Sequence, residues 1–290
     1  MQNTSFNQST LRVRTAARLL RAIPAGVRGR WRLGRAILGS DIALENIRIT
    51  SLTGNVFLVP CLQEPVAFSL LVDGTYEPET LALIHSLMPA DGSFVDIGAN
   101  IGLFAIEVAK KLSGRGHVLA IEASPTVFRY LRGNVDACGL SNVCVENIAV
   151  NSGDSDHTDF YEAPVSSFGM GARAPQFYAP STSLPAASLD QILSRTGFPL
   201  PNVIKIDVEG FEADVFRGGL QCLSGAQAPA IVFEFVDWAE ARSGGVVGEA
   251  QRLLLDIGYQ LQVIESKEQL SAPLTAPLLE GAAMLLARRT

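Results

Sequence analysis

The 290-residue chain is poor in cysteine and histidine and has no long apolar run. Its four cysteines contain no CxxC pair and its three histidines lie far apart in the sequence, so no metal site of that kind is predicted. We expect reduced thiols in a cytoplasmic protein. The longest apolar runs, such as 282–287, fall well short of the roughly 20 residues of a membrane-spanning helix, so no transmembrane segment is predicted.

The first 40 residues lack aspartate, glutamate and lysine but contain eight arginines. The net charge of the whole chain is −6 and that of this segment is +8, so the remainder has a net charge of −14. So acidic a body argues against a nucleic-acid partner. An apolar stripe at helical spacing, ended by Pro24, predicts a helix whose apolar positions are Val13, Ala16, Ala17, Leu20 and Ile23. Three interpretations stay open: a helix folded onto the acidic body, peripheral contact with an anionic membrane or a partner, and a cleaved targeting peptide.

Three regions follow from the patterning. Residues 1–40 form the basic helical arm, 41–77 a small β-hairpin-like extension, and 78–290 the main domain. In the main domain apolar strands alternate with helices, which predicts an α/β fold with a doubly wound, mostly parallel sheet. The expected strands are 94–98, 117–122, 143–150, 203–208, 231–236, 259–264 and 282–288; the expected helices are 101–112, 125–137, 211–223 and 246–256. The stretch 163–182, rich in Gly, Pro and Ser, is expected to be a loop over a site.

The segment "FVDIGANIGLF" predicts a strand, a glycine turn and a helix start. Gly98 and Gly102 permit close backbone approach, and Glu122, at the end of the next strand, can accept both hydroxyls of a ribose. Asn100 replaces the middle glycine of GxGxxG, and Asp96 would repel a pyrophosphate. A sulfonium cation near Asp96, with a carboxylate at the helix start, fits better, and this describes S-adenosyl-L-methionine. A purely structural turn is the alternative.

Six motifs occur in order: "GTYEPET", "FVDIGANIGLF", "IEASP", "SLDQIL", "IKIDVEGFEADVFRGG" and "VFEF". With them, residues 70–240 resemble the FkbM family of class I S-adenosylmethionine-dependent methyltransferases. The resemblance implies a seven-stranded Rossmann-like sheet with an antiparallel last strand. It implies methyl transfer, usually to a hydroxyl oxygen of a sugar, glycan or other polar small molecule. The cofactor-binding residues it implies are Asp96, Gly98, Asn100, Gly102 and Glu122, with Glu146 and Asn147 near the adenine.

Charged residues interrupt the strand "NVIKIDVEG". Lys205 and Asp207 share one face of it, because alternate side chains point the same way. In the strand order that the resemblance implies, Asp96 and Glu234 end the neighbouring strands, so Lys205 can be paired when buried. Transfer to a neutral hydroxyl needs a base, and no histidine is expected at a strand end. We predict Asp207 as the base or acceptor-orienting group, Glu209 as second candidate, and Lys205 as the group that fixes the charges.

Alternatives to this assignment remain open. Lys205 and Asp207 can form a structural ion pair while Glu209 and Glu212 favour a helix start, or acids here can bind a divalent metal. Tyr76 and Glu77 can close over the pocket, and acceptor contacts in the long loop can come from Ser166, Ser167, Phe168 and Arg173. At the level of function, the rivals are an NAD(P)-dependent oxidoreductase and a non-catalytic nucleotide-binding module.

Overall fold

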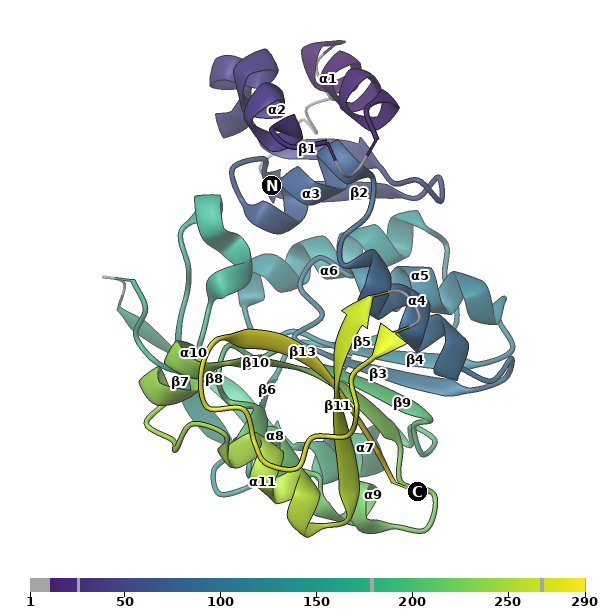
Figure 1. Ribbon diagram of the computed structural model, residues 1–290, viewed down its shortest axis with the longest axis vertical. Coiled ribbons are helices and arrows are strands. Elements are labelled where there is room, and N and C mark those ends of the chain that lie inside the picture. The colour runs from purple at the N-terminus through teal and green to yellow at the C-terminus, as the bar shows by residue number, and fades with distance from the viewer. Residues whose placement is uncertain (1–10, 25–26, 178–179, 267–268, 290) are drawn as a thin grey trace.

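The computed structural model describes residues 11–24, 27–177, 180–266 and 269–289 (Figure 1). An eight-stranded sheet lies at its centre, in the order β12-β11-β13-β10-β9-β3-β4-β5. The strands are β3 (Ser93–Ile97), β4 (His117–Ile121), β5 (Val143–Glu146), β9 (Val203–Ile206), β10 (Ala230–Val236), β11 (Tyr259–Ser266), β12 (Gln269–Leu270) and β13 (Ala282–Arg289).

Five strands, β5-β4-β3-β9-β10, pair in parallel, and β13 runs antiparallel between β10 and β11. The prediction of an α/β fold with a doubly wound, mostly parallel sheet is therefore confirmed, including the antiparallel last strand. The eighth strand, β12, is a two-residue return that pairs with β11 across an irregularity in the register. A segment this short has no periodicity from which a strand could be predicted.

Helices cover both faces of the sheet, and residues of β3 alternate between two apolar cores. Phe94 packs in one core with α4 (Pro78–Leu87), α5 (Leu103–Leu112) and α6 (Pro125–Ala137). Val95 and Ile97 pack in the other with α7 (Leu189–Thr196), α8 (Glu212–Gly218) and α11 (Glu249–Asp256). Two further helices are α9 (Leu220–Ser224) and α10 (Asp237–Arg242). The expected single helix over 211–223 is split into α8 and α9 at Gly219.

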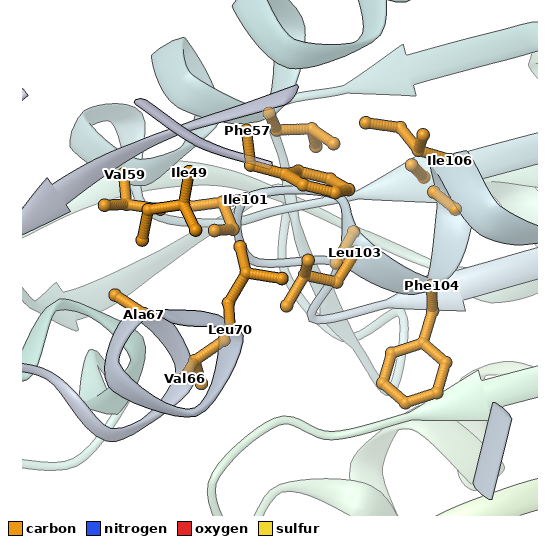
Figure 2. Close-up of a cluster of buried hydrophobic side chains, with 14 of the residues drawn as sticks. Ile49, Phe57, Val59, Val66, Ala67, Leu70, Ile101, Leu103, Phe104 and Ile106 are labelled. Atoms are coloured by element: carbon orange, nitrogen blue, oxygen red, sulfur yellow. The ribbon is translucent and has the colours of Figure 1, made fainter. Parts of the chain in front are cut away.

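The N-terminal part stands at one end of the molecule (Figure 1). It consists of α1 (Leu11–Ala22), α2 (Arg30–Leu38), the 3₁₀ helix η1 (Gly39–Ala43), the antiparallel hairpin β1 (Glu45–Thr50) and β2 (Val56–Cys61), and α3 (Pro65–Asp73). Figure 2 shows Phe57 of the hairpin above Leu103 at the start of α5, Ile49 and Val59 beside Ile101 of the preceding turn, and α3 below them. These side chains belong to the same core as Phe94, so arm, extension and sheet share apolar packing.

The prediction for 41–77 was a β-hairpin-like extension; β1 and β2 form a hairpin there, and α3 is a helix that the prediction did not include. The helix begins at Pro65, with the Glu64 carboxylate accepting a hydrogen bond from the Ala67 N–H, and ends at Gly74 in the left-handed region. Most of its residues are buried. Because it is apolar on nearly every side, its sequence lacks the polar face by which a helix is recognised.

The predicted strand 143–150 is two strands. It breaks at Asn147, whose side-chain N–H groups donate to the carbonyls of Glu122 and Ala123. The second part, β6 (Ala149–Asn151), joins a separate sheet of order β6-β8-β7 with β7 (His157–Tyr161) and β8 (Ser181–Ser188). The expected loop contains a 3₁₀ helix, η2 (Val165–Met170), before β8. Within the described ranges, no helix is long and apolar enough to cross a membrane.

Candidate active site

A cavity of about 220 Å³ lies at the carboxyl ends of β3, β4, β9 and β10. The glycine turn after β3, the residues after β4 and β9, and η2 form its walls. In open α/β sheets this edge is where ligands bind. Six of the ten predicted site residues line this one cavity: Gly98, Asn100, Glu122, Lys205, Asp207 and Glu209.

The glycine turn is sterically demanding. Gly98 has φ +78°, and a Cβ added there would lie 1.8 Å from the Asp207 carbonyl oxygen. Asn100 also has positive φ, and Gly102 caps the N-terminus of α5, where an added Cβ would meet Leu131. Gly98 therefore lets the ends of β3 and β9 touch, whereas Gly102 lies outside the lining and shapes the turn.

Glu122 bridges two loops at the end of β4. Its Oε2 accepts a hydrogen bond from the Asn100 N–H at 2.9 Å, and its Oε1 accepts one from the Ser124 N–H at 2.8 Å. Burial raises the pKa of Glu122 to about 7, although the two N–H donors oppose the shift. The carboxyl group is thus oriented from both sides while it faces the cavity.

Asp96 lies behind the cavity rather than in its lining. It is 1% exposed and stands opposite Lys205 in the β3–β9 register. Its Oδ2 accepts from the Ala105 N–H at 3.1 Å, whereas Oδ1 has no hydrogen-bond partner among the described residues. Burial raises the pKa of Asp96 to about 6, with Lys205 opposing.

Lys205 is buried among acids, at 2% exposure. Its Nζ lies 3.0 Å from Asp207 Oδ2 and 4.8 Å from the centre of the Phe104 ring. Burial disfavours the ammonium, yet the pKa of Lys205 is raised because the carboxylates of Asp207, Asp96 and Glu77 outweigh it. Lys205 is therefore charged in the folded protein and holds Asp207 in place.

Further acids line the same cavity. Burial, followed by Asp207, raises the pKa of Glu209 to about 7. Burial and the charges of Asp207 and Glu209 also raise the pKa of Glu234. Glu209 has φ +57°, and its carbonyl accepts a hydrogen bond from Arg242 at 3.2 Å. Across the described ranges, no three His, Cys, Asp or Glu residues are grouped so that they could hold a metal ion.

The structure does not bring Glu146 and Asn147 into the lining of the cavity. The Glu146 Oε2 lies 2.5 Å from Arg195 Nη2, and the Asn147 side chain donates hydrogen bonds to the backbone after β4. The chain turns at Asn147 from β5 into β6. Asn147 thus supports the backbone of Glu122, and its contact with an adenine, like that of Glu146, stays a prediction.

Other lining residues come from distant parts of the chain. Tyr76, Phe168 and Arg173, expected as candidates, line the cavity, whereas Ser166, Ser167 and Glu77 do not. Arg173 Nη1 donates to Asp214 at 2.7 Å.

Sequence reasoning missed Glu64, the 2% exposed N-cap of α3. A Cβ added at Gly169 would lie 3.1 Å from Glu64 Oε1 and 2.7 Å from Asn100 Nδ2, so η2 closes over both. Only the Glu-Pro pair at the helix start could have pointed to Glu64.

A second cavity, of about 650 Å³, lies beside the first. Arg21, Ile23 and Arg30 of the arm contribute to its lining, together with α3, the β1–β2 turn and α5. Tyr76, Leu103 and Phe104 line both cavities.

The profile of the methyltransferase FkbM domain matches residues 96–261, more than half of the chain, and the chain belongs to this family. The family predicted from the motifs is thereby confirmed. The matched residues include the glycine turn, Glu122 and the strand that carries Lys205 and Asp207.

Two curated proteins are similar to the chain. The hexuronic acid methyltransferase AglP of Haloferax volcanii is 29% identical over 143 residues, which cover 49% of this chain and 56% of AglP. The AMB antimetabolite synthetase AmbE of Pseudomonas aeruginosa is 25% identical over 234 residues, which cover 69% of this chain and 11% of AmbE. The chain thus spans little more than half of one relative and a small part of the other.

Solved structures show a distant likeness. The O-methyltransferase TomG of Streptomyces achromogenes has a TM-score of 0.43 at 13% identity, covering 74% of this chain and 79% of TomG. A precorrin-6y C5,15-methyltransferase of Geobacter metallireducens also has a TM-score of 0.43, at 16% identity, covering 73% of this chain and 87% of the other. The strand order of the chain itself defines its fold.

Proposed function

We propose that the chain is an S-adenosylmethionine-dependent methyltransferase that methylates a hydroxyl of a sugar, glycan or other polar small molecule. One observation carries the proposal: the glycine turn and Glu122 line the same cavity as Lys205, Asp207 and Glu209. The residues suited to bind the methyl donor and a carboxyl group able to accept a proton therefore face the same cavity, where the donor and a small acceptor could bind together.

The residues present fit this cofactor. Gly98 leaves the turn open at a place where a side chain would collide with Asp207, so a ligand can approach the backbone there. Glu122, oriented by two N–H donors, suits the ribose hydroxyls. A cationic donor would favour the ionised form of Glu64, Glu209 and Glu234, whose pKa values burial raises, whereas a diphosphate such as that of NAD would oppose their ionisation.

The bound cofactor would supply a methyl group on a positively charged sulfur. Asp207, held by Lys205 at 3.0 Å, would orient the acceptor hydroxyl and accept its proton as the new bond forms. Glu209 lies two residues on, with its pKa raised to about 7, and is the second candidate for that proton. Both side chains are partly exposed to the cavity, of which η2 forms a wall, so a bound acceptor would displace water from them.

The acceptor class rests on the family and on one relative. AglP, by its name, methylates a hexuronic acid. Arg173 lines the cavity next to acidic residues and provides a cation for an acceptor carboxylate or hydroxyl. A hexuronic acid or a neutral sugar is therefore the first acceptor to test.

Substitution of Asp207 tests the catalytic role. Because a positioned base contributes about 10²- to 10⁴-fold, Asp207→Asn should lower kcat at least about 100-fold. Binding of S-adenosylhomocysteine, measured by calorimetry, should change little, since the proposed cofactor contacts follow β3 and β4. The measurement is transfer of a labelled methyl group to hexuronic acid and neutral sugar acceptors.

Two comparisons make the result decisive. Asp154→Asn alters an exposed aspartate in the turn before β7 and should leave kcat unchanged. Glu209→Gln separates the two carboxyl groups: if it removes turnover and Asp207→Asn does not, the assigned roles are reversed. Binding of NAD in place of S-adenosylhomocysteine would contradict the proposed function itself.

A further inference from the structure

The two N-terminal helices and the described residues between them expose large apolar side chains together with arginines. We call these residues the arm surface. Its exposed apolar members are Leu11, Leu19, Val27, Trp31 and Leu33, with Leu11 75% and Leu19 53% exposed. Its exposed arginines are Arg12, Arg14, Arg18, Arg28, Arg32 and Arg35.

The arrangement follows from how the helices pack. α1 turns Val13, Ala16 and Leu20 inward against α2 and α3, which leaves Leu11 and Leu19 on its outer side. α2 lies beside α1 at the same end of the molecule (Figure 1). Leu11 and Leu19 thus face outward although the helices already have a buried core, so packing within the chain does not account for these two side chains.

The charge of this end is opposite to that of the rest of the chain. Residues 1–40 contain eight arginines and no acid, and the remainder carries −14. Arg12 lies 3.8 Å from Asp41, and Arg35 lies over the Phe68 ring, so part of the positive charge is engaged locally. Arginines that extend from an otherwise acidic protein favour an anionic partner.

The mixture of groups indicates which anionic partner. A nucleic-acid surface needs cations and hydrogen-bond donors, and exposed leucines contribute nothing to phosphate contacts. Helices at a lipid interface instead need leucine and tryptophan for the acyl boundary and arginine for the headgroups. The Trp31 ring packs edge-on against Phe68, with ring centres 5.1 Å apart. The rest of the Trp31 side chain is exposed at the surface.

We propose that the arm surface docks the protein on an anionic phospholipid bilayer. Leu11, Leu19 and Trp31 enter the headgroup boundary, the arginines contact the lipid phosphates, and the acidic body stays away from the bilayer. This function is independent of the methyl-transfer chemistry. It also places the larger cavity, which Arg21 and Ile23 help to line, at the end of the protein that meets the membrane.

The test is co-sedimentation of the full chain with vesicles. Phosphatidylcholine vesicles are compared with vesicles in which a third of the lipid is phosphatidylserine. Because each arginine near an anionic bilayer contributes about fivefold in affinity, Arg14→Glu with Arg18→Glu should weaken binding at least about 25-fold. Leu11→Asn with Leu19→Asn, two exposed sites that the proposal places in the headgroup boundary, should weaken it as well, and added salt should weaken binding of the wild type.

Matched controls carry the same changes elsewhere. Arg115→Glu with Arg129→Glu alters two exposed arginines on the main domain, and Leu200→Asn with Leu220→Asn alters two exposed leucines there. Both controls should bind the anionic vesicles like the wild type. Circular dichroism of every variant verifies that the helices are retained.

Tryptophan fluorescence gives a second readout. The chain has two tryptophans, Trp31 and Trp238. With Trp238→Phe, brominated lipid in the anionic vesicles should quench the emission of Trp31, whereas with Trp31→Phe the emission of Trp238 should be unaffected.

The proposal is overturned by any of three results. These are no binding to anionic vesicles, equal loss of binding in the control variants, or tighter binding of duplex DNA than of vesicles through the same arginines. Anionic-lipid binding that is lost in both arm-surface variants and retained in both controls supports it.

Discussion

Gly98 has the least freedom of any residue of the candidate site. The carbonyl oxygen of Asp207 occupies the space that a Cβ at position 98 would need. Only glycine at this position therefore allows the ends of β3 and β9 to approach each other this closely. The contact joins the turn assigned to the cofactor to the residue assigned to catalysis.

Gly98→Ala should therefore destabilise the protein by about 3 kcal/mol or more, since backbone must move to admit the methyl group. Gly114→Ala is the matched control: φ is +77°, as at Gly98, but no described atom lies within 4 Å of the added Cβ. It should cost only about 1–2 kcal/mol, the intrinsic cost of the left-handed conformation. Urea unfolding of the two variants measures the difference, and equal losses would show that Asp207 does not restrict this position.

Single residues differ in how far they could be predicted. Glu122 and Asp207 follow strands that are recognisable from their β-branched residues, so their meeting at one edge could be predicted from topology alone, whereas Asp96 lies within β3 and behind the cavity. Glu64 could not be predicted, because it reaches the cavity through packing of α3 on the turn, and such packing has no local pattern.

At the scale of elements, the interior strands were predictable because burial on both faces gives continuous apolar runs. β5 and β6 were not separated in the prediction, because both are apolar and only the side-chain hydrogen bonds of Asn147 mark the turn between them. α3 was missed for a related reason, since its mostly apolar nine residues suit a buried helix as well as a strand.

The strand ends also predict a pH dependence. Burial raises the pKa of Glu122 from 4.5 to about 7 and that of Glu209 likewise. A carboxyl group whose pKa is higher in the folded state stabilises the fold below its unfolded pKa, and this contribution is lost as pH rises through about 7. The free energy of unfolding should therefore fall as the pH rises from 4.5 to about 7, the window between the unfolded and folded pKa values. Burial lowers the pKa of His85, and this shift makes the free energy of unfolding rise with pH, opposite to the effect of the two carboxyl groups.

Urea unfolding at pH values below, within and above the window measures this slope. Glu122→Gln with Glu209→Gln should flatten it, whereas Glu280→Gln, an exposed site, should not. A cationic ligand should reverse the trend, because it favours the ionised carboxyl groups and releases protons when it binds. A stability that rises steadily from pH 5 to pH 8 would contradict the prediction.

For the whole molecule, the arm is part of the fold rather than an appendage. Leu20 of α1 and Phe94 of the sheet belong to one apolar core, and Arg30, 6% exposed, lies 2.7 Å from Asp73 at the end of α3. The sequence predicted the helix through its stripe, but which surface it would cover depended on α3, which was not foreseen.

Leu20→Ala should lower the free energy of unfolding by about 2–5 kcal/mol, because it leaves a cavity in a shared core. Leu11→Ala, on the exposed side of the same helix, should change it by less than about 0.5 kcal/mol. Denaturant unfolding should show a single transition for both variants. A separate early transition in Leu20→Ala would mean that the arm unfolds independently.

Tyr76, Leu103 and Phe104 belong to two cavities at once, and the Phe104 ring lies against the Lys205 ammonium. The same ring is therefore part of the wall of both cavities. A molecule bound under the N-terminal helices would contact the ring that lies over the lysine paired with Asp207, so we expect the rate of methyl transfer to respond to a compound that never touches the reacting atoms.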